Sequence, residues 1–166
     1  MTKTKSGFLK AGSIIAIVMA AIIAMFGLTF IAGRTMVDRD MVVEAVFEMK
    51  IEDVEVINNA DGSISYKNPT TGARLESREV DDLIKVTKMI LVTIGVYSIA
   101  MAIASLIIGV FNLVATSQEK AKTGFIITQL VLSIFTANIL TFAFMIAALC
   151  LKDKKVEENT VESTVA

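Results

Sequence analysis

The sequence predicts an all-α membrane protein, a three-helix transmembrane bundle with a small β-hairpin or meander cap between helices 1 and 2. Of the 166 residues, 54% are hydrophobic, which is more than an ordinary soluble domain carries. Three apolar runs, over residues 11–33, 89–115 and 125–151, contain no charged side chain. Each run is long enough to cross a bilayer as one helix.

The run over residues 89–115 organises the rest of the prediction. Its small and weakly polar residues recur at steps of three and four, so they share one face of a helix. Membrane helices associate by close packing across such residues and by side-chain hydrogen bonds. We therefore expect a helix-packing seam made of Gly95, Ser98, Ala102, Ser105, Gly109 and Asn112.

Residues 1–33 are predicted to form an N-terminal segment and the first transmembrane helix. Lys3, Lys5 and Lys10 precede an apolar run that is longer than the apolar region of a cleavable signal. We interpret it as a retained signal anchor, and a cleaved signal that ends near Ala32 is the alternative. A ridge of small residues is expected to pack against the seam of the second helix, and it consists of Ala16, Ala20, Ala24 and Gly27.

Residues 34–85 change abruptly in composition and are predicted to form an acidic extramembrane loop. Its first part favours a helical extension of the first span to about Met49. Alternating apolar and polar residues then predict strands, with turns at the NNADG and NPTTG sequences. Ser77, followed by acidic residues, is typical of a helix start ahead of the second transmembrane helix over 86–116.

A short loop over 117–123 then leads to a predicted third transmembrane helix over 124–151, and a charged tail over 152–166 is expected to be disordered. The third helix carries a second seam of period 3.5. Asn138 lies off this seam, where we expect an interhelical hydrogen bond. The second seam comprises Gln129, Ser133, Thr136, Leu140, Ala143, Ala147 and Cys150.

Three spans place the two termini on opposite sides of the membrane. The positive-inside rule then leans slightly against a cytoplasmic N-terminus, because five lysines flank the membrane on the N-terminal side and seven Lys or Arg flank it on the other. The basic N-terminus and the turn-rich loop favour a cytoplasmic N-terminus. We expect a multi-pass protein of the plasma (cytoplasmic) membrane with its N-terminus in the cytoplasm.

The stretch EKAKTGFIITQLVLSIFTANILTFAFMIAALCLKDKK resembles the C-terminal half of a family of small uncharacterised multi-span membrane proteins of Gram-positive bacteria. The resemblance rests on Lys120, Lys122, Gly124, Ser133 and the lysines of 152–155. It implies a bacterial membrane protein with a basic connection between two spans. That family has no assigned activity, so it implies no catalytic residue.

The composition excludes several classes of function. The chain has no histidine, one cysteine (Cys150) and a net charge of −1, which argues against metal sites, histidine-based catalysis and nucleic-acid binding. We predict no catalytic residue, no cofactor and no metal, and the sequence identifies no small-molecule substrate. The expected partners are the lipid bilayer and another membrane protein or a second copy of the chain.

Two functions remain open. The first is a non-enzymatic integral membrane protein that acts through helix–helix and protein–protein contacts, as an accessory subunit or a small homo-oligomer. Its support is that no ionisable residue lies inside the three apolar runs, since such residues mark ion and proton pathways. The alternative is an oligomeric passive pore or small-solute permease lined by Ser, Thr, Asn and Gln.

Overall fold

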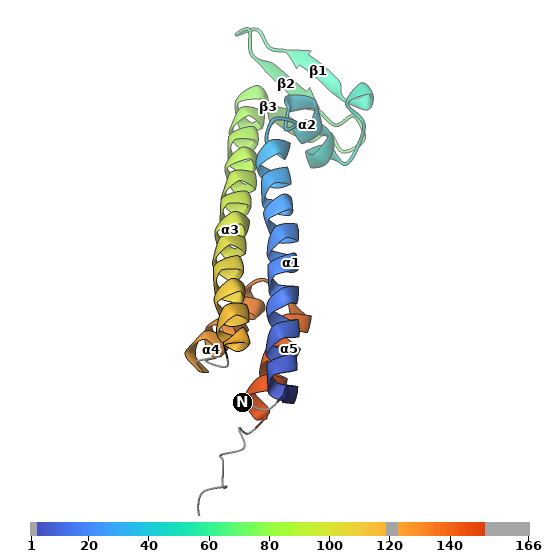
Figure 1. The fold of residues 1–166 in the computed structure, drawn as a ribbon. Helices are drawn as coiled ribbons and strands as arrows, with labels where there is room; N and C mark the ends of the chain where they lie inside the picture. The colour runs from blue at the N-terminus through green and yellow to red at the C-terminus, as the bar shows by residue number, and fades with distance from the viewer. Residues whose placement is uncertain (1–2, 119–122, 152–166) are drawn as a thin grey trace, which may run out of the picture. The chain divides into compact units, whose positions relative to one another are not determined.

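The computed structural model describes residues 3–118 and 123–151 and is mostly helical, with one small sheet (Figure 1). Residues 119–122 of the predicted short loop and the predicted charged tail over 152–166 lie outside the described residues. The chain divides into two compact units. We call Phe26–Tyr97 the cap unit, and Met1–Met25 with Ser98–Ala166 the helical unit.

Two long helices each contribute to both units. Helix α1 covers Lys3–Gly33 and helix α3 covers Ser77–Ser117. Both are long and apolar enough to cross a membrane, by length and composition. The start of α3 at Ser77 agrees with the sequence prediction, and the Glu79 carboxylate accepts a hydrogen bond from the backbone N–H of Glu76 at this end.

The sheet of the cap unit is a three-stranded antiparallel meander, as the alternating pattern predicts. Its strands are β1 (Glu55–Asn58), β2 (Ile64–Lys67) and β3 (Arg74–Glu76), in the order β1-β2-β3. Gly62 and Gly72 lie in the two connections with φ of 83° and 72°. Glycine adopts this left-handed conformation without a steric penalty, which allows both tight reversals.

The predicted helical extension of the first span to Met49 is wrong. Helix α1 ends at Gly33, a turn comes next, and a separate helix α2 covers Arg39–Phe47. Asp38 starts α2, because its carboxylate accepts a hydrogen bond from the backbone N–H of Met41 at 2.9 Å. An aspartate in this position satisfies a backbone donor that a helix start otherwise leaves unpaired.

Helix α2 and the sheet share the hydrophobic core of the cap unit. A 3₁₀ turn, η1 (Ile51–Asp53), joins α2 to β1. The backbone N–H of Ile51 donates to the Glu44 carboxylate, which ties this turn to α2. The core consists of Val37, Val42, Val43, Val54, Tyr66 and Val80.

The predicted single third helix over 124–151 is also wrong, and the helix count of three is wrong with it. The run forms two helices, α4 (Thr123–Phe135) and α5 (Ile139–Cys150). The chain bends at Ala137, whose φ is 51°, and the Asn138 side chain then caps α5 by accepting a hydrogen bond from the backbone N–H of Thr141.

Helices α4 and α5 form a hairpin and pack against one another. Ile126, near the start of α4, shares one hydrophobic cluster with Met145 and Ala148, near the end of α5. Leu9 of α1 belongs to the same cluster. The start of α4 and the end of α5 therefore both lie beside the N-terminal part of α1.

Candidate functional site: helix seams and a cap groove

The two long helices reverse the usual distribution of side chains. Small and polar residues are buried, while large apolar residues such as Val18, Phe26 and Met89 are exposed, with exposed fractions of 54%, 60% and 69%. A water-soluble helix buries its large apolar face instead. This reversed pattern is the one that helices surrounded by lipid require.

Within the cap unit, the two seams meet at Gly27 of α1 and Gly95 of α3, and both residues are buried. A Cβ atom added at Gly95 would lie 2.7 Å from the Gly27 carbonyl oxygen and 2.5 Å from Cγ1 of Ile31. Real Cβ atoms essentially never approach heavy atoms so closely. Glycine at position 95 therefore allows the two backbones to come together.

Within the helical unit, Gly109 of α3 occupies the corresponding place against α1. A Cβ atom added at Gly109 would lie 3.1 Å from Cγ1 of Ile17, 3.4 Å from the Ser13 carbonyl oxygen and 3.6 Å from Cβ of Ala16. Ala16, Ala20 and Ala102 are buried as well. Ala24 of α1 and Ser98 of α3 are half-buried.

Helix α4 adds its polar side chains to the seam of α3. Nε2 of Gln129 donates to Oγ of Ser105 at 3.4 Å, and Nδ2 of Asn112 donates to the Phe125 carbonyl oxygen at 3.0 Å. Ser133 is buried on the same face, and Thr136, the residue after α4, is half-buried.

The second predicted seam does not continue past the bend. Ala143 is exposed and Ala147 half-buried, and Leu140 and Cys150 are exposed. The left-handed residue at the bend interrupts the helical period, so α5 begins in a new register. Its buried face consists of Thr141, Met145 and Ala148.

Several buried polar residues were not predicted from the sequence. Ser13 extends the ridge of α1 by one turn at a step of three from Ala16, a signal that was present in the sequence. Thr116 likewise extends the seam of α3, at a step of four from Asn112, whereas Thr141 had no comparable signal. Among the described residues, five buried side-chain atoms lack a hydrogen-bond partner, and all belong to the helical unit: Ser13 Oγ, Asn112 Oδ1, Thr116 Oγ1, Gln129 Oε1 and Thr141 Oγ1.

The cap unit has a second feature, an apolar groove of about 320 Å³ between α2 and α3. Met41 and Val46 of α2 stand exposed on it, and Leu91 extends it to the apolar run of α3. Exposed apolar side chains gathered in one place mark sites of protein or membrane contact. Its lining residues are Val37, Met41, Val42, Ala45, Val46, Leu83, Thr87 and Leu91.

An ion pair fixes α2 to α3 near this groove. Nη2 of Arg39 donates to Oδ1 of Asp81 at 2.6 Å. This hydrogen bond is the main cause that raises the pKa of Arg39, and Tyr66 adds to it. Both side chains are more than a third exposed, so water screens the pair.

The part of the chain that the structure describes contains no group of three or more His, Cys, Asp or Glu that could hold a metal ion. No family model, no curated protein and no solved structure matches this chain. The resemblance to small Gram-positive membrane proteins therefore stays a prediction.

Proposed function

We propose that the chain is a non-enzymatic integral membrane protein that acts through protein–protein contacts, as an accessory subunit. The observation that carries this proposal is the reversed distribution of side chains on α1 and α3, with small residues packed and large apolar residues exposed. The core helix of a soluble protein does not have this pattern.

The contacts of α1 favour a retained anchor over a cleaved signal. Removal of residues up to Ala32 would leave Gly95 without its contact to Gly27 and Gly109 without its contact to Ser13. The seam of α3 packs against small residues of α1 in both units. This packing favours two helices that stay together in the mature protein over a first helix that is removed.

The α4–α5 hairpin supports a cytoplasmic N-terminus. Helices of 13 and 12 residues extend about 20 Å and 18 Å, less than the roughly 30 Å of a bilayer core. The hairpin begins and ends beside Leu9 of α1, which supports a topology in which the start of α1 and the end of α5 lie on one side of the membrane.

This topology changes the count of charges near the membrane. Four Lys or Arg flank the cap side, namely Arg34, Arg39, Lys85 and Lys88. The N-terminal side then has eight lysines, and by the positive-inside rule this charge bias supports a cytoplasmic location for it. The eight are Lys3, Lys5, Lys10, Lys120, Lys122, Lys152, Lys154 and Lys155.

Cysteine labelling in intact cells tests this topology. In a Cys150→Ser background, Ser63→Cys and Thr164→Cys are probed separately with a membrane-impermeant maleimide. We expect Ser63→Cys to react from outside, because Ser63 is exposed in the cap, and Thr164→Cys to react only after permeabilisation. Labelling of both from outside would instead mean three crossings.

The cap groove is where we place the partner. Because it continues into the apolar run of α3 through Leu91, it fits an apolar helix of another membrane protein that emerges from the bilayer beside α3. The seams are not available for this contact, since Gly95 and Gly109 are covered within the chain. This argues against a homo-oligomer built on the seams.

Site-specific photo-crosslinking tests the contact in cells. A photoreactive residue at Met41 or Val46, both exposed in the groove, should give one discrete adduct with a membrane protein. The matched control is Val56, which is exposed on β1 outside the groove. Adducts of equal yield from Val56, or loss of the chain from membranes in alkaline carbonate, would refute the proposal.

The five unpartnered polar atoms favour one alternative, a passive pore or small-solute permease. A buried polar atom without a partner costs about 1–3 kcal/mol, and water or a polar solute could provide the missing hydrogen bonds. However, each of these atoms is closed off from solvent. Osmotic swelling of proteoliposomes with glycerol or urea decides the question: permeation above that of empty vesicles, and its loss in Gln129→Leu, would favour the permease.

A further inference from the structure

Two cationic residues mark the ends of the two long apolar runs in the cap unit. Arg34 follows Gly33, the last residue of α1, and Lys88 precedes Met89, the first residue of the apolar run of α3. They come from segments more than fifty residues apart. Nevertheless, both line one pocket of about 450 Å³.

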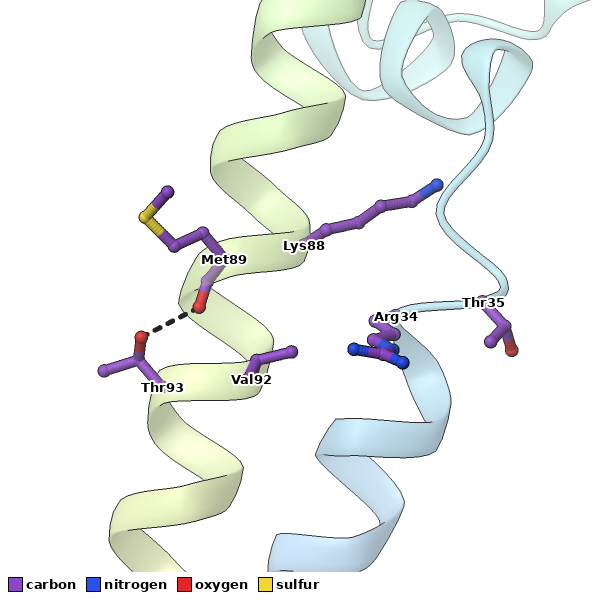
Figure 2. A pocket seen from close by; sticks show the side chains of 6 residues that line it. All are labelled: Arg34, Thr35, Lys88, Met89, Val92 and Thr93. Atoms are coloured by element: carbon purple, nitrogen blue, oxygen red, sulfur yellow. Dashed lines mark hydrogen bonds between the residues drawn. The ribbon is translucent and has the colours of Figure 1, made fainter.

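Figure 2 shows how this pocket is built. The Lys88 side chain extends from α3 across the gap toward the chain that leaves α1, and the Arg34 guanidinium faces the same space. Val92 points into the gap below them. The pocket is therefore cationic at one end and apolar at the other.

Arg34 and Lys88 have no acidic partner among the described residues, unlike three other cations of the cap unit. Arg39, Lys67 and Lys85 form ion pairs with Asp81, Glu55 and Asp82. Neither Arg34 nor Lys88 forms an ion pair within the described part of the chain.

The hydroxyl groups of the pocket do not supply donors. Oγ1 of Thr93 donates to the Met89 carbonyl oxygen at 2.9 Å, drawn in Figure 2, and Oγ1 of Thr35 donates to the Ala32 carbonyl oxygen at 2.8 Å. The free donors are those of the guanidinium and the ammonium group. Such a pair of donors above an apolar wall suits an anion that carries a hydrocarbon chain.

We propose that Arg34 and Lys88 together bind the phosphodiester headgroup of an anionic phospholipid, whose acyl chain lies along Val92. The proposal rests on the membrane insertion proposed above, which brings Arg34 and Lys88, at the ends of the two apolar runs, to the level of the lipid phosphates. Basic residues next to a membrane span are each attracted to anionic lipid. Two that share one pocket hold a single phosphate from two sides.

The experiment is lipid binding by the purified full-length chain, followed by native mass spectrometry from detergent micelles. The probes are phosphatidylglycerol and phosphatidylcholine with identical acyl chains. We expect wild-type protein to prefer phosphatidylglycerol. The affinity should fall about fivefold in Arg34→Gln or Lys88→Gln and about thirtyfold in the double variant.

The matched control is Lys85→Gln, which removes the same charge from α3 but from a lysine that is paired with Asp82 outside the pocket. Arg34→Lys and Lys88→Arg keep the charge and should retain binding, which separates loss of the site from loss of the fold. An equal loss in Lys85→Gln, or equal binding of phosphatidylcholine, would overturn the proposal.

Two further experiments identify the source of the phosphate and show whether a negative result refutes this inference alone or the proposed function as well. Competition by millimolar glycerol 3-phosphate would mean that the pocket takes a free phosphate ester, and the lipid proposal would be wrong. Extraction with alkaline carbonate tests insertion separately. A chain that stays in the membrane but shows no lipid preference refutes this inference alone, whereas a chain that is extracted refutes the proposed function as well.

Discussion

Replacing Ala137 with glycine tests whether the last apolar run is bent or forms one continuous helix. Ala137 has a φ of 51°, a left-handed conformation that costs a residue with a Cβ atom roughly 1–2 kcal/mol. Glycine adopts it without that cost but loses about 0.4–1 kcal/mol through the greater freedom of the unfolded chain. The net expectation for Ala137→Gly is a stabilisation of about 0.5–1 kcal/mol.

A continuous helix predicts the opposite sign. Glycine in the interior of a helix is about 1 kcal/mol less favourable than alanine, so Ala137→Gly would then be destabilising. Ala143→Gly is the matched control, because Ala143 is exposed and lies inside a helix whether the run is bent or continuous. It should destabilise the protein by about 1 kcal/mol.

The assay is equilibrium unfolding of the purified protein in mixed micelles with increasing dodecyl sulfate, monitored by circular dichroism. The quantity to compare is the free energy of unfolding of Ala137→Gly against Ala143→Gly, which should differ by roughly 1.5–2 kcal/mol. If both variants are destabilised equally, Ala137 lies in an ordinary helix. The hairpin, and with it the proposed topology, would then be refuted.

Three further predictions concern the cap unit and its helices. Gly95→Ala should destabilise the protein by about 1–3 kcal/mol through overpacking. Gly7→Ala is the control and should be neutral or stabilising, because there is open space around the added Cβ. Equal free energies of unfolding for the two variants in dodecyl sulfate titrations would contradict the close approach of α1 and α3 at Gly95. Val43→Ala removes a fully buried core side chain and should cost about 2 kcal/mol, seen as faster proteolysis of the cap in membranes; unchanged cleavage would refute that core. The Lys67 ammonium holds the pKa of Glu55 below its usual 4.5. The pair therefore stabilises the sheet above pH 4.5, and this stabilisation is lost as the pH falls through the lowered pKa. A Glu55→Gln variant with the same acid unfolding profile as the wild type would rule this out.

The sequence predicted the parts of the fold that depend on short-range periodicity. The steps of three and four residues identified the packed faces of α1 and α3, because a helical period holds wherever a helix is uninterrupted. The turn residues Gly62 and Gly72 located the reversals of the sheet, since they permit a backbone that other residues avoid. The acidic start at Ser77 located the beginning of α3.

The separate helix α2 could have been predicted but was not. Aspartate is a preferred residue at the start of a helix. The Asp38 carboxylate accepts a hydrogen bond from the backbone N–H of Met41, three residues later. The apolar residues around it fitted neither period cleanly, which favoured a continuation of α1. The local capping signal was more informative than the periodicity.

The bend at Ala137 had a weaker signal, and its consequences were larger. No glycine or proline lies in the run from Phe125 to Leu151, and alanine is the residue that most favours a helix. Asn138 was the one available sign, because asparagine caps helices as well as it forms interhelical hydrogen bonds. In the structure, Asn138 caps the start of α5, and its side chain accepts a hydrogen bond from the backbone N–H of Thr141.

The two roles of Asn138 lead to different topologies of the chain. As an interhelical hydrogen-bond donor, it would sit in a third span, the seam would continue to Ala143 and Ala147, and the termini would lie on opposite sides. As a helix cap, it starts α5 in a new register and buries Thr141 and Met145 instead. In the proposed topology, α5 then returns the chain to the side from which α4 began. A periodic pattern identifies which face of a helix packs, but it assumes that the helix is continuous. Where that assumption fails, the seam and the charge balance across the membrane change together, so the labelling of Thr164→Cys and the stability of Ala137→Gly must agree with each other.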